Sequence, residues 1–324
     1  MHNPLQVLKH YWGYDGFRPG QAEVIDSILS GHDTLALMPT GGGKSITFQV
    51  PALANPGICL VVSPLVALMK DQVKNLQKRG ILSAFISSEM PHWEILQQLD
   101  NCILGDYKFL YISPERISSE LFQEKLKTLS RKVNLLVVDE AHCISQWGND
   151  FRRDYRLIAD IRDVIPHVQV IAVTASATAA VVADICEQLH FRKGYRIFKT
   201  SFERKNLSFV VRKTDNKLKE ICHILSAVPG SAVIYSRTRK GVEEYAGKLR
   251  AAGISAEYFH AGLDPVLKTE RQADWVKGFT RVLVATNAFG MGIDKGDVRV
   301  VIHTEFPDSM EVYYQEAVSY THLT

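Results

Sequence analysis

The stretch Met38-Pro39-Thr40-Gly41-Gly42-Gly43-Lys44-Ser45 decides how the chain around it folds. The apolar run Thr34–Leu37 before it predicts a short buried strand, and the residues after it predict the first turns of a helix. Consecutive glycines let the backbone turn tightly and aim N–H groups inward, and the helix N-terminus adds further unpaired N–H groups. Lys44 supplies a cation for the outer phosphates of a nucleotide, and Ser45 supplies a hydroxyl suited to Mg²⁺. The stretch therefore predicts a phosphate cradle, although Met38 stands where the strict GxxxxGK[ST] pattern has its first glycine.

A glycine turn that merely precedes a lysine is the alternative, and the strand–loop–helix context disfavours it. We expect the nucleotide phosphates to be bound by Thr40, Gly41, Gly42, Gly43, Lys44 and Ser45.

Size and composition predict a protein with two sizeable cores. The chain has 324 residues, of which 46% are hydrophobic and 23% are charged, and its net charge is +3. This charge is too mild to prove nucleic-acid binding, but it does not oppose it. The five cysteines lie far apart without a CxxC pair, which indicates reduced thiols rather than a disulfide framework or a zinc site. With neither a signal peptide nor an apolar run of membrane-spanning length, we expect a cytoplasmic protein, in the bacterial cytosol or nucleoid, with no membrane partner.

Strands and helices alternate along the chain. Apolar runs that predict buried parallel strands are Ile58–Val62, Phe109–Ile112, Leu135–Val138 and Val168–Val173, and a helix is expected from Pro64 to Lys78. Near residue 200 a second unit begins, with expected strands at Leu207–Val211, Ala232–Tyr235, Ala256–Phe259, Val282–Ala285 and Val298–Ile302, and expected helices at Val242–Ala252 and Leu267–Phe279. The pattern predicts two α/β domains, residues 1–200 and 201–324, with a nucleotide cleft between them.

A second chemical signal is the sequence Asp139-Glu140-Ala141-His142, which follows an apolar strand. Ligands bind at this edge of α/β sheets, so Asp139 is expected to hold Mg²⁺ with Ser45, and Glu140 to orient and deprotonate the water that attacks the γ-phosphate. Lys44 completes the expected catalytic set. The alternative is a solvated helix N-terminus that favours acids, and the upstream cradle argues against it.

Together the cradle and the Asp-Glu-Ala-His sequence resemble superfamily 2 helicases, and further stretches resemble the RecQ family of DNA helicases. The stretch from Leu8 through Trp12-Gly13, Phe17-Arg18 and Gln21 resembles the family's adenine-reading motif. The resemblance implies that Gln21 bonds the adenine edge and that Arg18 supports the nucleotide. It implies two tandem RecA-like domains, with ATP and Mg²⁺ as ligands and no zinc site in this chain. The alternative for this stretch is a surface turn with exposed aromatic residues.

Two stretches resemble the parts of RecQ enzymes that contact DNA or couple it to ATP. In Ser63–Val73, the loop and helix N-terminus would touch a DNA backbone through Ser63, and a plain core helix is the alternative. Ser145–Tyr155 resembles the aromatic-rich loop, in which Trp147 and Phe151 offer faces for unstacked bases and Arg152 offers a phosphate partner. This loop has Asn149 where the family usually has histidine. The coupling residues implied are His142, Gln146 and Thr174.

In the second domain, three stretches resemble the family's later motifs in order: Tyr235–Arg239, Tyr258–Leu263 and Ala285–Lys295. By this resemblance Asp294 would face ATP, and the DNA backbone would be followed by Ser236, Arg237, His260 and Thr286. The resemblance fails after Glu316, because residues 317–324 differ from the glycine–arginine segment that carries the family's arginine finger. An arginine finger is worth roughly 10³–10⁵ in turnover, so we expect this chain to bind Mg-ATP but to hydrolyse it poorly.

The sequence thus predicts a RecQ-type, ATP-dependent DNA helicase core that moves 3′ to 5′ along single-stranded DNA and unwinds forked duplexes. A translocase or an RNA helicase with the same motor is the first alternative, and a nucleic-acid clamp that does not hydrolyse ATP is the second. No protein partner can be named from the sequence.

Overall fold

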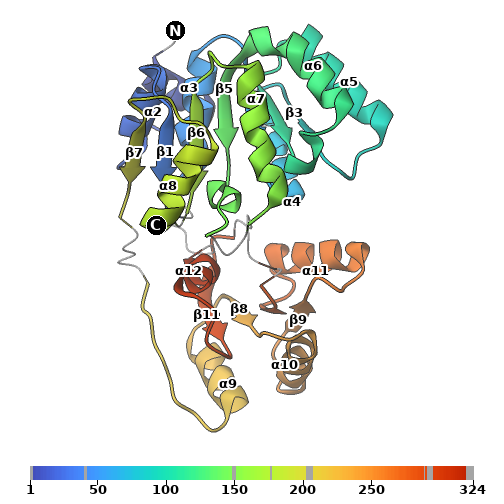
Figure 1. Cartoon of the computed structure of the whole chain (residues 1–324). Coiled ribbons are helices and arrows are strands. Elements are labelled where there is room, and N and C mark those ends of the chain that lie inside the picture. Colours follow the sequence, from blue (N-terminus) through green and yellow to red (C-terminus); the bar gives the residue numbers. More distant parts are fainter. Residues whose placement is uncertain are drawn as a thin grey trace. The chain divides into compact units, whose positions relative to one another are not determined.

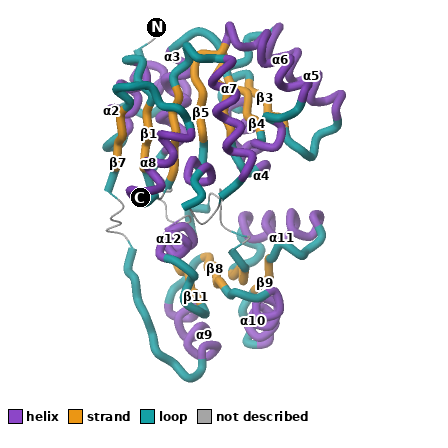
Figure 2. Tube along the Cα trace, viewed as in Figure 1, coloured by secondary structure: helices purple, strands orange, loops and turns teal. Residues whose placement is uncertain are grey.

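The computed structural model describes residues 3–39, 42–147, 151–175, 177–201, 207–287, 289 and 295–318. The chain divides into two compact units, Met1–Phe202 and Glu203–Thr324, each with its own sheet and hydrophobic core. Figure 1 shows the course of the chain, and Figure 2 distinguishes its helices from its strands. Both sheets are parallel throughout the described pairings, which confirms the predicted α/β class.

The first unit is built on a seven-stranded sheet in the order β3-β4-β2-β5-β6-β1-β7. Its strands are β1 (Thr34–Leu37), β2 (Ile58–Val62), β3 (Ser83–Ile86), β4 (Phe109–Ile112), β5 (Val133–Val138), β6 (Val170–Thr174) and β7 (Arg196–Lys199). The central strands are buried on both faces because their sequences are nearly continuous apolar runs. The strands β5, β6 and β1 are neighbours, so the segments that follow them emerge along one stretch of the sheet edge.

Helices cover both faces of this sheet (Figure 1). One face carries α1 (Pro4–Trp12), α2 (Gln21–Leu29), α3 (Lys44–Ala54) and α4 (Val66–Gln77), and the other carries α5 (His92–Leu104), α6 (Glu120–Leu129), α7 (Ile158–Val164) and α8 (Ala179–Gln188). Short 3₁₀ helices are η1 (Pro114–Arg116), η2 (Ser130–Lys132), η3 (Ala141–Ile144) and η4 (Arg153–Leu157). Alternate residues of β1 show the two layers, since Ala36 packs with the first group and Leu35 with the second.

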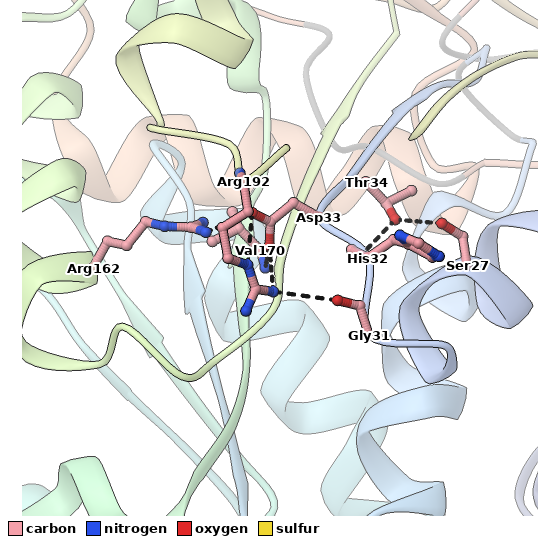
Figure 3. A network of polar contacts seen from close by, with 8 residues as sticks. All are labelled: Ser27, Gly31, His32, Asp33, Thr34, Arg162, Val170 and Arg192. Carbon is pink, nitrogen blue, oxygen red and sulfur yellow. Dashed lines mark hydrogen bonds and ion pairs between the residues drawn. The ribbon is translucent and has the colours of Figure 1, made fainter. Parts of the chain in front are cut away.

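A buried ionic network ties together the amino ends of β1 and β6 (Figure 3). Asp33 is 1% exposed, and its carboxylate accepts hydrogen bonds from Arg162 at 2.5 Å, from Arg192 at 2.9 Å and from the backbone N–H of Val170 at 3.0 Å. The backbone carbonyl of Asp33 accepts from the N–H of Arg196, the first residue of β7. The network therefore joins α7, the segment before β7 and two central strands at the edge opposite the cradle.

The second unit has a four-stranded sheet in the order β11-β8-β10-β9. Its strands are β8 (Ser231–Tyr235), β9 (Ala256–Phe259), β10 (Val282–Ala285) and β11 (Val298–His303), and its helices are α9 (Lys217–Ala227), α10 (Arg239–Ala251), α11 (Pro265–Lys277) and α12 (Met310–Val318). One face packs against α9 and α10, and the other packs around Trp275, which is fully buried.

The strands expected from the sequence differ from the structure in two ways. The segment Leu207–Val211 was expected to begin the second sheet, but it forms no strand, and Phe209, Val210 and Val211 are 50%, 66% and 80% exposed. Its β-branched and aromatic residues favour extended backbone, yet a strand also needs a hydrogen-bonded neighbour. Conversely, the sequence does not predict β3 or β7, and in β7 the exposed residues Arg196 and Lys199 interrupt the apolar pattern.

All five cysteines are free thiols in the structure. Cys59, Cys102, Cys143 and Cys186 are buried, whereas Cys222 on α9 is partly exposed. Burial raises the pKa of the Cys59 thiol well above its ordinary value, the pKa of Cys102 to about 12 and the pKa of Cys186 to about 11. These thiols are therefore protonated at neutral pH.

Candidate nucleotide and nucleic-acid site

The predicted phosphate cradle lies between β1 and the N-terminus of α3. Gly43 caps α3 with φ of 75°, a left-handed conformation that favours glycine. A Cβ on Gly43 would lie 2.4 Å from Nε2 of Gln21, and one on Gly42 would lie 2.8 Å from the carbonyl oxygen of Pro39. A Cβ at either position would therefore force a neighbouring group to move, and at Gly43 it would also strain the backbone. Thr40 and Gly41, also predicted to bind phosphate, lie outside the described residues.

Gln21, predicted to read adenine, contacts the cradle in this structure. Its side chain is 3% exposed, and its Nε2 donates to the carbonyls of Gly43 at 3.2 Å and Gly42 at 3.3 Å. Its Oε1 accepts from the backbone N–H of Arg18 at 2.9 Å, while the Arg18 side chain is exposed. The first turn of α2 is thus bonded to the glycine turn. The adenine-reading role of Gln21 and the nucleotide-supporting role of Arg18 stay predictions.

The structure brings Lys44 and Glu140 together at the carboxyl edge of the sheet. Nζ of Lys44 lies 3.7 Å from Oε1 of Glu140, and both side chains are largely buried, at 14% and 15% exposed. On the other side, Oε2 of Glu140 lies 3.4 Å from Nδ1 of His142, which also lies 2.9 Å from the hydroxyl of Thr174. Since Thr174 ends β6, the predicted coupling residues His142 and Thr174 link two adjacent strand ends.

Glu140 has a strained backbone. Its φ of 46° and ψ of 48° place a residue with a Cβ in the left-handed region, at a cost of roughly 1–2 kcal/mol. The hydroxyl of Tyr155, a fully buried side chain, donates to the carbonyl of Asp139 at 2.8 Å and so fixes the peptide just before Glu140. Strain of this kind is often found at functional sites, where surrounding contacts maintain it.

The environment of Asp139 destabilises the ionised form of its carboxylate. Burial and the neighbouring Glu140 carboxylate raise the pKa of Asp139 to about 6, although Lys44 and hydrogen bonds from the Glu140 amide and the Ser63 hydroxyl act in the opposite direction. A cation bound beside Asp139 would favour its charged form. The carboxylate is therefore placed in a setting that a divalent cation would stabilise.

The donor set at the cradle fits magnesium. Ser45 and Asp139 offer a hydroxyl and a carboxylate, and Mg²⁺ is usually held by one or two protein oxygens together with substrate phosphates and water. Such a site needs no cluster of protein ligands, and no group of three or more His, Cys, Asp or Glu side chains that could hold a metal occurs among the described residues.

Ser45 is held by a row of polar side chains that the sequence did not single out. Nε2 of Gln72 on α4 donates to Oγ of Ser45 at 3.2 Å, and Oε1 of Gln72 accepts from Nε2 of Gln49 at 3.0 Å. Gln49 also lies 3.3 Å from the hydroxyl of Tyr111, and both are nearly fully buried. A glutamine inside the apolar sequence of α3 was the available signal. It shows that a polar group is buried, but not what it binds.

Part of the aromatic-rich loop is described, up to Trp147 and again from Phe151. Trp147 is 76% exposed, and its backbone N–H donates to the hydroxyl of Ser145 at 3.2 Å. Phe151 is partly exposed, with the guanidinium of Arg156 5.2 Å from its ring centre. Gln146 is exposed, and Asn149 lies outside the described residues. The loop therefore presents one large aromatic face to solvent.

Arg152 and Ser63, both predicted to contact DNA, point to partners within the first unit. Nη1 of Arg152 donates to the carbonyl of Pro64 at 3.2 Å, and its backbone N–H donates to the carbonyl of Cys143 at 2.8 Å. The side chain of Ser63 is 1% exposed, and its hydroxyl donates to Oδ2 of Asp139 at 3.2 Å. Contact of either residue with DNA stays a prediction.

In the second unit, Ser236, His260 and Thr286 follow three neighbouring strands, β8, β9 and β10, so they share one sheet edge. All three are mostly buried, and Nε2 of His260 lies 3.0 Å from Oε1 of Glu243. Arg237 is exposed and donates to Asp308 at 2.5 Å and to the carbonyl of Phe306 at 2.8 Å. Asp294, predicted to face ATP, lies outside the described residues.

Comparisons with known proteins agree with the motifs. The DEAD/DEAH box helicase family profile matches residues 18–185, and the profile of the helicase conserved C-terminal domain matches residues 216–318. The chain is 42% identical over 320 residues to the ATP-dependent DNA helicase RecQ of Bacillus subtilis, covering 98% of this chain and 54% of the relative. It is 40% identical over 313 residues to RecQ of Pasteurella multocida, covering 96% of this chain and 49% of that protein. The chain thus spans about half the length of these curated relatives, and the resemblance predicted from the motifs is confirmed.

Solved structures give the same fold. The helicase Lhr of Mycobacterium smegmatis, bound to ssDNA and AMP-PNP, matches with a TM-score of 0.75 and 19% identity, over 98% of this chain and 46% of that chain. At this level of identity the likeness concerns the fold alone. Among the described residues, no helix has the length and apolar character needed to cross a membrane.

Proposed function

Because this chain belongs to the DEAD/DEAH box helicase family, we propose that it is the motor part of an ATP-dependent DNA helicase similar to RecQ. The observation that carries the proposal is the 3.7 Å contact between Lys44 and Glu140, two residues far apart in sequence. This contact joins a phosphate cradle to a carboxylate suited to activating water. Phosphoryl transfer needs mainly positioning and charge compensation, and these groups provide both.

In the proposed reaction, the N–H groups at the start of α3 bind the phosphates, and Lys44 compensates the charge of the outer ones. Glu140 orients the attacking water and accepts its proton, while His142 limits the rotation of the Glu140 carboxylate. Ser45 and Asp139 would hold magnesium, which when bound neutralises charge on the phosphate oxygens. In the second unit, Asp294 is proposed to face the nucleotide.

The proposed polymer is single-stranded DNA, with forked DNA as the substrate for unwinding and 3′ to 5′ as the direction. Trp147 and Phe151 are proposed to stack on unstacked bases, since base–aromatic stacking contributes about 1–3 kcal/mol per base. Arg152, Ser236, Arg237, His260 and Thr286 are proposed to contact the backbone. Exposed Gln146, with His142 and Thr174, is proposed to relate DNA binding to the ATP site.

The testing experiment measures ATP hydrolysis by residues 1–324 with single-stranded DNA, RNA or no oligonucleotide. We expect DNA to stimulate hydrolysis, and we expect Lys44→Ala and Glu140→Gln to abolish the stimulated rate. Glu140→Gln should retain AMP-PNP binding, because it removes the proposed base while keeping the size of the side chain. Equal rates for wild type and Glu140→Gln would contradict the proposed role of Glu140.

Three other outcomes are informative. Stimulation by RNA rather than DNA would favour an RNA helicase, and stimulation without strand displacement on forked DNA would favour a translocase. Binding of AMP-PNP and DNA without any turnover, after a family-like glycine–arginine segment is restored behind Glu316, would favour a clamp. The slow turnover predicted from the sequence after Glu316 stays a prediction, which the turnover number tests. The cytosolic location also stays a prediction.

A further inference from the structure

Both oxygen groups assigned to magnesium accept hydrogen bonds from one short stretch of chain, Ser63–Gln72. At its beginning, directly after β2, the hydroxyl of Ser63 donates to Oδ2 of Asp139 at 3.2 Å. Near its end, on α4, Nε2 of Gln72 donates to Oγ of Ser45 at 3.2 Å. Ser45 lies in the first turn of α3 and Asp139 directly follows β5, so this stretch connects the two halves of the proposed metal site.

Gln72 lies between Ser45 and a second glutamine. Its Oε1 accepts from Nε2 of Gln49 at 3.0 Å, and its NH₂ group faces Ser45. Gln49 is itself held by the hydroxyl of Tyr111 at 3.3 Å, and these two side chains are 3% and 2% exposed. A buried row of polar groups therefore holds the Gln72 side chain beside the serine.

These hydrogen bonds determine which lone pairs on the oxygens of Ser45 and Asp139 remain available to coordinate a cation. A serine oxygen that accepts a hydrogen bond still has a second lone pair, and the donor limits rotation about its Cβ–Oγ bond. The carboxylate of Asp139 is held at both oxygens, because Oδ1 also accepts from the backbone N–H of Glu140 at 3.0 Å. Neither ligand can turn freely.

We propose that Ser63 and Gln72 are positioning residues that orient Asp139 and Ser45 toward the magnesium of a bound nucleotide. The proposal rests on the proposed function, since it needs a magnesium–nucleotide complex at the cradle. Hydrogen bonds to metal ligands commonly change metal affinity or activity by 10–100-fold. For Ser63, this gives the side chain a role at the nucleotide, whereas its sequence position alone indicates contact with DNA.

The test measures binding of AMP-PNP to residues 1–324 by calorimetry, with magnesium and with a chelator, so it does not depend on turnover. The readout is the ratio of the two dissociation constants. We expect Ser63→Ala and Gln72→Leu each to reduce the magnesium-dependent gain about tenfold, leaving the affinity without magnesium unchanged. In a Ser45→Ala background, Gln72→Leu should cause no further loss of the magnesium-dependent gain. In an Asp139→Asn background, Ser63→Ala should likewise cause no further loss.

Matched controls come from the same region. Gln77 on α4 donates to the carbonyl of Ser83 at 2.9 Å, and the hydroxyl of buried Ser83 donates to the carbonyl of Ile81 at 3.2 Å. Gln77→Leu and Ser83→Ala lose similar hydrogen bonds away from the cradle, so the magnesium ratio should not change. Thermal unfolding of every variant identifies any loss of folded protein.

Two results overturn the positioning role: an unchanged ratio in Gln72→Leu and Ser63→Ala while Ser45→Ala lowers it, or an equal loss of affinity with and without magnesium. Failure of the proposed function looks different, because the wild type would then bind no AMP-PNP, or Lys44→Ala would bind it as well as the wild type.

Discussion

Asp33 is the residue whose environment has the clearest energetic consequence. Its side chain is fully buried between Arg162, at 8% exposed, and Arg192, at 39% exposed. Burial alone would raise the pKa of Asp33, but hydrogen bonds from the side chain and backbone of Arg192, from the Val170 amide and from Arg162 outweigh it and lower the pKa below 3.8. Removing one partner of a buried ion pair leaves the other charge uncompensated.

We therefore expect Asp33→Asn to lower the free energy of unfolding of the first unit by about 3–5 kcal/mol at neutral pH. Because the folded-state pKa is depressed, the stabilising contribution is complete above the unfolded-state pKa and is lost as the pH falls through the folded-state value. Below pH 3.8, the ordinary value, the difference between wild type and Asp33→Asn should shrink. Denaturant titrations followed by circular dichroism at several pH values measure it.

The control is Asp15→Asn, which removes the exposed pair of Lys9 and Asp15, with side chains 71% and 84% exposed. That change should cost at most about 1 kcal/mol. A variant at Asp33 that remains as stable as the control, or whose deficit persists unchanged in acid, would contradict the account of the buried network.

The short motifs in the sequence single out residues that the structure brings together, as for Lys44 and Glu140, while their roles stay predictions. It does not predict Gln72 or Tyr155, whose importance depends on which backbone or side chain the fold brings to them. The partner of Gln72 is Ser45, on a different helix, and the partner of Tyr155 is a carbonyl oxygen. Neither pairing has a signature in residue type or spacing.

Among the elements, the turn that joins β1 to α3 contains a glycine in the left-handed region, Gly43. Gly43 and Gly80 both have φ of 75°, but a Cβ on Gly43 would collide with Gln21, whereas nothing lies within 4 Å of a Cβ on Gly80. An alanine at Gly80 would therefore introduce backbone strain alone, whereas an alanine at Gly43 would introduce the same strain together with a steric collision.

Gly80→Ala should lower stability by roughly 1–2 kcal/mol from strain alone and keep AMP-PNP binding. Gly43→Ala should show the same strain and also break the hydrogen bonds of Gln21 to the cradle, so we expect AMP-PNP affinity to fall at least about tenfold, or about 1.4 kcal/mol. Calorimetric titration and thermal unfolding of both variants measure these effects. Equal affinities in the two variants would show that the contact between α2 and the cradle is not needed for binding.

Elements with continuous apolar sequences were predicted correctly, including β2, β4, β5 and β10. The failures lie at the edges of the first sheet and near the start of the second unit. The strand β7 lies at an edge of the sheet, where one side of its backbone has no neighbouring strand and charged side chains discourage further pairing. Leu207–Val211 has strand-like composition but no partner strand among the described residues, and pairing is a property of the fold rather than of one segment.

For the whole molecule, net charge limits how DNA can be bound. A charge of +3 spread over 324 residues gives little general attraction to phosphates, so affinity should depend on local groups such as Trp147. Stacking on an aromatic side chain does not release counterions, and its loss should therefore leave the salt dependence unchanged.

We expect Trp147→Ala to weaken binding of single-stranded DNA by about 1–3 kcal/mol while the slope of affinity against salt stays the same. Fluorescence anisotropy with a labelled oligonucleotide at several salt concentrations measures both. Trp93→Ala is the control, because Trp93 is 67% exposed on α5 and Trp147 is 76% exposed. Comparable losses of DNA affinity in both variants would show that Trp147 has no specific role in binding. A changed slope of affinity against salt would indicate lost phosphate contacts.

The distribution of thiols makes the chain suitable for optical work without prior mutagenesis. Four of the five cysteines are buried in the first unit, and the partly exposed one, Cys222, belongs to the second unit. A maleimide dye applied to the folded protein at neutral pH should therefore attach mainly at Cys222. Energy transfer from that dye to one on a nucleotide or on an oligonucleotide end would then report how far α9 lies from each ligand during a binding cycle.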